Sequence, residues 1–417
     1  MKSTPLLHSK PGLDSSRAGT DAVAPRPENG AFSSRPETGA GAQVVAFSIT
    51  RTVINTLHRM VYPFLEVLAR GVGVDLITMS YALTARSLVG TIGPFAAAVA
   101  DRRGRKFGML FGIGLFTLGT AVVVFWPVFP ALVISIILST LGKYIFDPSM
   151  QAYLGDRIPY SRRGRTIAVT EFGWSLAFIL GIPLMGFLIA RGGWMAPFPL
   201  MALLGGLIFA GLFWMLPKDG QPGADNPTFS VNFRTVLTFT PALAGLAVGL
   251  LASAANEVVN LIFGVWLEDS FGLQIAALGA ASAVIGLSEL CGEGLVAVFV
   301  DRLGKPRAIG LGLAANCLAA VALFFLGHTE VGALVGLFLF YITFEFTLVS
   351  VIPMMTEVLP SARATLMAFN VASLSLGRAL GDLLAPRLYL WGFWSVVIGA
   401  VAFNLLALLA LRKVKTA

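Results

Sequence analysis

Ionisable residues lie inside long apolar stretches of this 417-residue chain, and these residues are the first candidates for a functional role. A charged side chain at the centre of a bilayer raises the free energy of membrane insertion by about 2.5–3.5 kcal/mol, so each one is expected to have a structural or functional role. Glu289 and Glu293 are four residues apart, on one face of a helix. Two carboxylates this close resist ionising together, and removal from water adds to that resistance. The pair therefore predicts reversible proton binding, and Glu289 is favoured because Glu293 lies nearer the end of its segment.

Two other glutamates are candidates for the same proton chemistry. Glu257 has no basic residue on its own segment, and its neighbours Asn256 and Asn260 are polar. Glu66 shares a helical face with Arg59, seven residues earlier, and a hydrated position at the rim of the membrane explains it equally well. Both glutamates are predicted to bind protons.

Two pairs of opposite charge have the spacing of neighbours on a helix. Lys143 precedes Asp147 by four residues, and Arg378 precedes Asp382 by the same interval. Such pairs can neutralise each other locally. They are either structural ion pairs or contacts to a substrate.

The remaining candidates could contact a small molecule. Arg86 either forms an ion pair with Glu66 or binds a substrate anion, and the sequence does not decide between these roles. Trp174 and Tyr341 could form aromatic walls beside a lipophilic or cationic compound, although packing is the commoner role of such residues. The predicted cavity set is Arg59, Arg86, Lys143, Asp147, Glu171, Trp174, Tyr341, Glu345, Arg378 and Asp382.

The segments that carry these residues are strongly apolar. Hydrophobic residues make up 56% of the chain and charged residues 12%, against about 25% charged in soluble proteins. A helix needs about 20 apolar residues to cross a bilayer. We therefore predict an all-α polytopic membrane protein with 12 transmembrane helices, near residues 45–70, 76–100, 107–126, 129–155, 165–190, 195–216, 241–267, 273–299, 308–327, 331–357, 364–389 and 393–411.

The polar stretches divide the chain into parts. Residues 1–43 are rich in Pro, Ser, Gly and Ala without apolar periodicity, and they predict a disordered tail. Six-helix halves are expected at 44–216 and 241–412, with a linker at 217–240 and a short tail at 413–417. Lys and Arg cluster in alternate loops, which predicts that both termini and the linker are cytoplasmic.

The intramembrane charges are unevenly distributed. The third, sixth, ninth and twelfth segments contain none. These four helices are expected to face lipid, and the other eight to enclose a polar cavity.

Two short stretches repeat 200 residues apart. AAVADRRGR at 97–105 recurs as AVFVDRLGK at 297–305, each where the second helix of its half ends. The first copy, followed by Lys106, resembles the G-x-x-x-D-R-x-G-R-K/R signature of the major facilitator superfamily, with Ala97 in place of the leading glycine. By topology the resemblance covers residues 45–412. It implies two pseudo-symmetric halves that alternate access to a site near the midplane.

The resemblance also implies a conformational latch at these loops. An Asp at a helix end, beside Gly and basic residues, can hold a turn and pair with a neighbouring helix. Asp156, at the end of the fourth segment, is the candidate partner. The latch residues implied are Asp101, Arg102, Gly104, Arg105, Asp156, Asp301, Arg302 and Gly304.

Other function classes lack support in the sequence. Cys291 and Cys317 lie in apolar runs, and His8, His58 and His328 are far apart, so neither metal site nor cofactor is expected. A net charge of +8 suits a cytoplasmic membrane face and not a nucleic-acid partner. No GxxxxGK[ST] loop or catalytic cluster predicts a pump or a membrane enzyme, although a receptor without transport activity stays open.

The function expected is secondary transport. The stretch GIPLMG at 181–186 resembles the Gly/Pro motif of the superfamily's drug antiporters, with Pro and Gly displaced. It favours a proton-coupled exporter of small amphipathic or cationic compounds. The alternative is an importer or facilitator of a polar metabolite or organic anion, bound by Arg59, Arg86 and Lys143. The partners expected are a small-molecule substrate, protons and the lipid bilayer, for a monomer in a bacterial inner membrane.

Overall fold

Helices form the regular structure of the chain. The computed structural model describes residues 40–101, 103–158, 160–217 and 233–414. The predicted tail and linker, 1–43 and 217–240, fall largely outside these ranges, and a short helix, α9 (Phe233–Thr238), lies at the end of the predicted linker. The prediction of an all-α protein is confirmed.

The first half contains eight α-helices and one π-helical turn: α1 (Ala40–Met60), α2 (Leu65–Val72), α3 (Leu76–Asp101), α4 (Arg105–Phe125), α5 (Phe129–Arg157), α6 (Tyr160–Leu176), η1 (Ala177–Gly181), α7 (Ile182–Gly192) and α8 (Pro197–Met215). The second half contains α10 (Thr240–Asn260), α11 (Phe263–Phe271), α12 (Ile275–Leu303), α13 (Lys305–Leu326), α14 (Glu330–Val358), η2 (Pro360–Ala362), α15 (Arg363–Tyr389) and α16 (Phe393–Leu411).

Three predicted segments are broken helices. The first segment of each half is divided in two, at 61–64 between α1 and α2 and at 261–262 between α10 and α11. Pro63 contributes to the first break because it cannot donate the backbone hydrogen bond that a continuous helix needs. The segment 165–190 contains a π-helical turn just before Pro183, where the same missing donor favours a widened turn.

Many of the helices can span a membrane. Within the described residues, nine stretches are long and apolar enough, or ten if the bent pair Leu65–Val72 and Leu76–Gly93 is one span. The count of 12 and the cytoplasmic location of the termini stay predictions.

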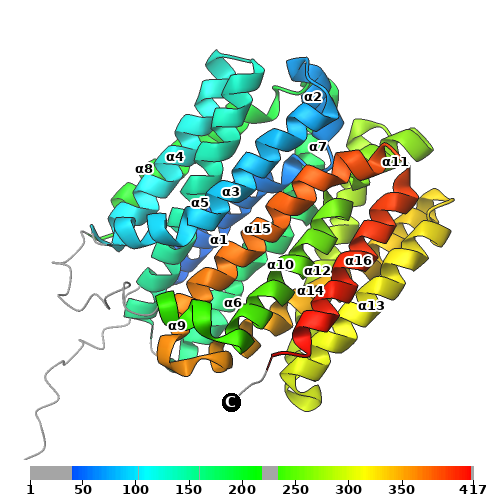
Figure 1. The fold of residues 1–417 in the computed structure, drawn as a ribbon. Helices are drawn as coiled ribbons and strands as arrows, with labels where there is room; N and C mark the ends of the chain where they lie inside the picture. The colour runs from blue at the N-terminus through cyan, green and yellow to red at the C-terminus, as the bar shows by residue number, and fades with distance from the viewer. Residues whose placement is uncertain (1–39, 102, 159, 218–232, 415–417) are drawn as a thin grey trace, which may run out of the picture. The chain divides into compact units, whose positions relative to one another are not determined.

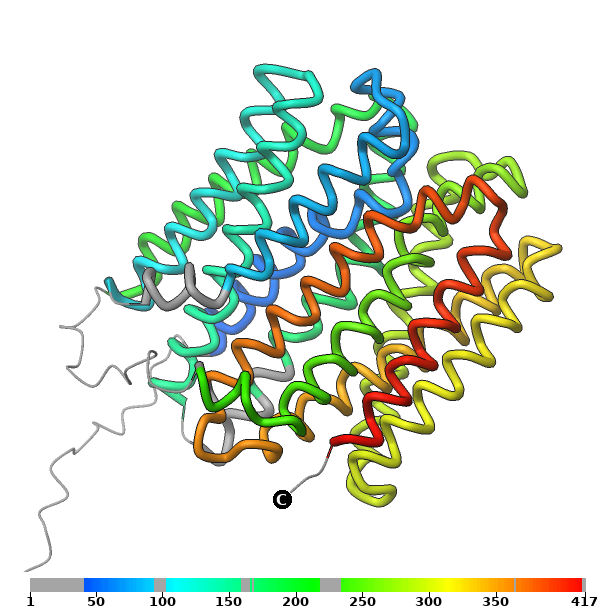
Figure 2. Tube along the Cα trace, in the orientation of Figure 1, coloured from blue at the N-terminus to red at the C-terminus, as the bar shows by residue number. Residues whose placement is uncertain are grey.

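The helices pack within each half and also between the halves. α4 packs against α5 and α8, and α13 packs against α14 and α16. Between the halves, α3 (blue) lies along α15 (orange), as Figure 1 and Figure 2 show, and α7 packs against α12. α4, α8, α13 and α16 expose large apolar side chains such as Leu118, Leu207, Leu318 and Ile398. This exposure agrees with the prediction that these four helices face lipid.

Candidate functional site

A cavity of about 600 Å³ lies between the two halves. Its lining comes from α1, α5 and α6 of the first half and from α10, α12, α14 and α15 of the second, while α4, α8, α13 and α16 contribute none of its lining. On α12 and α14 the lining residues lie from the middle of the helix toward the end of the bundle that carries Gly104 and Gly304. The sequence predicts this end to be cytoplasmic.

A buried ion pair between α1 and α12 joins the two halves at the cavity wall. Arg59 donates two hydrogen bonds to Glu289, with Nη1 2.7 Å from Oε2 and Nη2 bonded to Oε1. The two residues are 5% and 2% exposed. The guanidinium of Arg59 lies 3.8 Å from the ring centroid of Trp174 and 3.9 Å from that of Phe178. Trp174 therefore covers the arginine, and the carboxylate of Glu289 faces a fixed positive charge.

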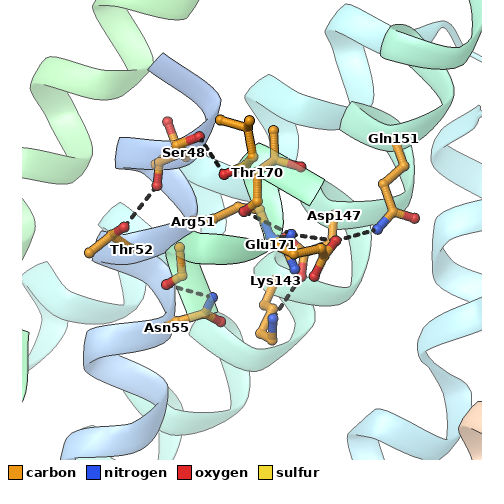
Figure 3. Close-up of polar contacts among 12 residues, drawn as sticks. Ser48, Arg51, Thr52, Asn55, Lys143, Asp147, Gln151, Thr170 and Glu171 are labelled. Carbon is orange, nitrogen blue, oxygen red and sulfur yellow. Dashed lines mark hydrogen bonds and ion pairs between the residues drawn. The ribbon is translucent and has the colours of Figure 1, made fainter. Parts of the chain in front are cut away.

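A second cluster, shown in Figure 3, joins α1 to α5 and α6. The Nε of Arg51 lies 3.3 Å from Asp147 Oδ1, and its Nη1 lies 2.6 Å from Glu171 Oε1 and donates to the carbonyl of Thr170 at 3.0 Å. Lys143 Nζ lies 2.6 Å from Asp147 Oδ2, as its helical spacing predicts. Two cations and two carboxylates thus neutralise one another within the first half.

Arg51 was missed by the sequence analysis although it is the centre of this cluster. Its signal was the spacing of Arg51, Asn55, Arg59 and Tyr62, at intervals of four, four and three residues. These intervals predict one helical face for the four polar side chains, and α1 carries Arg51, Asn55 and Arg59 of them.

Arg86 lies in a third group, away from Glu66. Arg86 donates to the hydroxyl of Tyr62 at 2.5 Å and to the carbonyl of His58 at 3.0 Å, and its Nη2 is 4.0 Å from Glu257 Oε1. Of the two roles predicted for Arg86, the ion pair with Glu66 is therefore wrong. Tyr62 is the hydroxyl partner of the arginine, and it lies in the break after α1, where the helical pattern could not place it.

Two other expectations are corrected by the structure. Glu66 does not share a helical face with Arg59, because the break after α1 turns the chain between them, and its Oε1 lies 4.0 Å from Arg70 Nε. Asp382 does not pair with Arg378: it accepts a hydrogen bond from Ser87 on α3 at 2.6 Å, since α3 packs directly against α15.

Three charged residues of the cavity wall stand apart from these pairs. Among the described residues, none hydrogen-bonds or forms an ion pair with Glu293, Glu345 or Arg378. Glu345 is only 6% exposed, and it lines the cavity with Glu293. Tyr341, by contrast, donates to Asn260 Oδ1 at 2.7 Å and packs edge-on against Phe340, so it is held in place by its own half.

The predicted latch loops form matching ion pairs. Arg105 Nε lies 3.2 Å from Asp156 Oδ2, and Lys305 bonds to Glu357 at the equivalent place in the second half. Both loops turn at a glycine with positive φ, 112° at Gly104 and 80° at Gly304, which favours glycine because other residues are strained there. Asp301 and Arg302 are exposed, whereas Arg102 and the side chain of Asp101 lie outside the described part of the chain.

The ion pair of Arg105 and Asp156 is expected to be weak. Asp156 is 59% exposed, and exposed pairs contribute about 0.2–1 kcal/mol. A double-mutant cycle with Arg105→Gln and Asp156→Asn, measured by thermal unfolding in detergent, should give a coupling energy in that range. The matched cycle with Lys305→Gln and Glu357→Gln should give a similar value, and a coupling above about 2 kcal/mol in either cycle would contradict exposure at these loops.

The other end of the bundle is closed by contacts between the halves. Arg70 of α2 lies 2.5 Å from Glu268 of α11. On neighbouring helices Arg387 donates to the hydroxyl of Tyr81 at 2.7 Å. The cavity is therefore shut on the side opposite the latch loops.

Comparison with known proteins identifies the family. Within the described residues, no group of three or more His, Cys, Asp or Glu side chains is arranged to hold a metal ion. The sequence model of the Major Facilitator Superfamily matches residues 47–381 and 245–416. The chain belongs to this superfamily. It is an integral, multi-pass membrane protein of a transporter family.

The relatives of this major facilitator protein are mostly bacterial. YbcL of Bacillus subtilis (strain 168), named an uncharacterized MFS-type transporter, is 21% identical over 373 residues, which cover 86% of this chain and 94% of YbcL. YdhP of Escherichia coli (strain K12), named an inner membrane transport protein, is 25% identical over 340 residues, or 81% of this chain and 86% of YdhP. These relatives agree with the expected location in a bacterial inner membrane.

Solved structures show the same fold. A bacterial homologue of the human lysosomal transporter Spinster, in an inward-facing and unoccupied conformation, has a TM-score of 0.70 at 14% identity and covers 91% of this chain and 95% of its own. A D-xylose–proton symporter has a TM-score of 0.70 at 16% identity, with coverage of 87% and 96%. The major facilitator fold predicted from the repeat is thereby confirmed.

Proposed function

We propose that this transporter exports small amphipathic or cationic compounds in exchange for protons. The observation that supports the proposal is the pair of cavity carboxylates, Glu293 and Glu345, neither of which forms an ion pair within 4 Å among the described residues. A buried carboxylate without a counter-charge is stabilised either by binding a proton or by binding a cationic group. Because one bound species excludes the other, such a site couples proton entry to the release of a cation.

The other predicted site residues have different proposed roles. Arg59 and Glu289 neutralise each other between the halves, as do Arg86 and Glu257 at a longer distance. We therefore propose Glu345, with Glu293, as the proton-binding group, and we propose that Glu289 and Glu257 position the arginines.

The alternative function, transport of an organic anion, has less support. It needs Arg59, Arg86 and Lys143 to be available to the substrate, and each is already bonded to a carboxylate or a tyrosine hydroxyl. Export is favoured over import by the resemblance of the 181–186 stretch to the motif of drug antiporters.

The test is ethidium accumulation in an efflux-deficient bacterial strain that expresses the protein. The wild type should lower accumulation several-fold, and a protonophore should remove this effect. Glu345→Gln should reduce export at least about tenfold, because the amide can neither bind a proton nor pair with a cation. Glu330→Gln is the matched control, since Glu330 is an exposed glutamate at the start of the same helix. Unchanged accumulation with the wild-type protein present in the membrane would overturn the proposal.

A further inference from the structure

Arg378 is the cavity-lining arginine that has no carboxylate oxygen within 4 Å among the described residues. Arg51, Arg59 and Lys143 line the same cavity, and each lies within 3.3 Å of a carboxylate oxygen. Asp382, one helical turn beyond Arg378, bonds instead to Ser87 across the interface with α3. The guanidinium of Arg378 thus lines the cavity without the carboxylate partner that Arg51, Arg59 and Lys143 have.

The surroundings of Arg378 suit an anionic group. Tyr144 and Ser375 line the cavity beside it, and their hydroxyls lie 3.5 Å from each other. A guanidinium presents its donors as a planar fork that matches a carboxylate with two parallel hydrogen bonds. In a site removed from water an unpaired charge is costly, so a bound anion would relieve that cost.

The unpaired charges of opposite sign occupy different walls. Arg378 is on α15, which packs against α10 and α3, whereas Glu293 is on α12, which packs against α14 and α7. Glu345, on α14, lies next to Glu293: a Cβ added at Gly292 would be 2.8 Å from the Cβ of Glu345. The cavity side chains without an ion pair are therefore positive on α15 and negative on α12 and α14.

We propose that Arg378 binds a carboxylate group of the transported compound, so that the preferred substrates are amphoteric. This inference rests on the function proposed above, which assigns the cationic group of the same compound to Glu345 and Glu293. An apolar body between the two charged groups would find Trp174 and Phe344 in the lining of the same cavity.

The test compares three indole compounds that differ only in their charged groups. Tryptophan carries both an ammonium and a carboxylate, tryptamine lacks the carboxylate, and indole-3-propionate lacks the ammonium. Isothermal titration calorimetry with the purified full-length protein should show tryptophan binding about tenfold more tightly than tryptamine, because its carboxylate adds charge-assisted hydrogen bonds to the guanidinium. Arg378→Gln should remove this difference by weakening tryptophan binding and leaving tryptamine binding unchanged.

Two further variants separate binding from folding. Arg378→Lys keeps the positive charge and should retain part of the preference for tryptophan. Arg363→Gln is the matched control, because Arg363 is an exposed arginine at the start of the same helix, bonded to the carbonyl of Thr356. Equal weakening of tryptophan and tryptamine in Arg378→Gln would assign a structural role to the arginine and overturn the proposal, as would the absence of binding by all three compounds.

Ethidium export by the wild type distinguishes this inference from the proposed function. Ethidium carries no anionic group, so its proton-driven export tests the proposed function without a carboxylate bound at Arg378. Absence of ethidium export by the wild type would overturn the proposed function. An unchanged preference for tryptophan in Arg378→Gln would overturn the role of Arg378 alone.

Discussion

Arg59→Met is expected to destabilise the folded protein by about 3–5 kcal/mol, because it leaves Glu289 buried without its counter-charge. The variant also removes the guanidinium from between Trp174 and Phe178. Thermal unfolding in detergent should show a clearly lower Tm, and transport should be lost.

The double variant Arg59→Met/Glu289→Met distinguishes the effect of an unpaired buried charge from the effect of changed side-chain shape. Replacing both members of a buried ion pair by apolar residues of similar volume is often neutral for stability, so the Tm should recover most of its loss. Transport should not recover, because the pair joins α1 to α12 between the halves. Arg363→Met, at an exposed site, is the control. An unchanged Tm in Arg59→Met would show that the pair does not form in the folded protein.

The helical framework was predictable because it depends on properties that are local in the sequence. Segment length and apolar content located the long helices, and the 200-residue repeat located the turns at Gly104 and Gly304. The breaks at 61–64 and 261–262 were not predicted, since averaged hydropathy is unchanged across them. Those breaks determine where Tyr62 lies, and with it the site of Arg86.

Apart from the latch pair of Arg105 and Asp156, which the family resemblance implied, the charge pairs were predictable only where both partners share a helix. The four-residue spacing on a helix correctly predicted the ion pair of Lys143 with Asp147. It failed for Arg378 and Asp382, because Ser87 lies across the interface between α3 and α15. Helical spacing also cannot find the partner of Arg59, which is 230 residues away in the sequence.

Gly186→Leu is expected to abolish transport without unfolding the protein. α7 and α12 approach closely here: a Cβ at Gly186 would be 3.1 Å from the carbonyl oxygen of Ile275 and 3.3 Å from the Cα of Gly279. The ring of Phe64 is also within 3.0 Å of that position. A leucine would force the two helices apart, because the Ile275 and Gly279 atoms are backbone and cannot rotate away. The halves would then fail to close at the end where Arg70 meets Glu268.

Spin labels measure this closure directly. After replacement of Cys291 and Cys317 by serine, labels at Asp75→Cys and Ser270→Cys occupy exposed positions on opposite halves of the closed end. Double electron–electron resonance should give a longer distance between the two labels in Gly186→Leu than in the parent protein. Gly206→Leu is the matched control, because a Cβ added at this glycine of α8 has no atom within 4 Å. An unchanged distance together with full transport would mean that the closed end tolerates separation of α7 from α12, and that the glycine contact is not what allows the halves to meet.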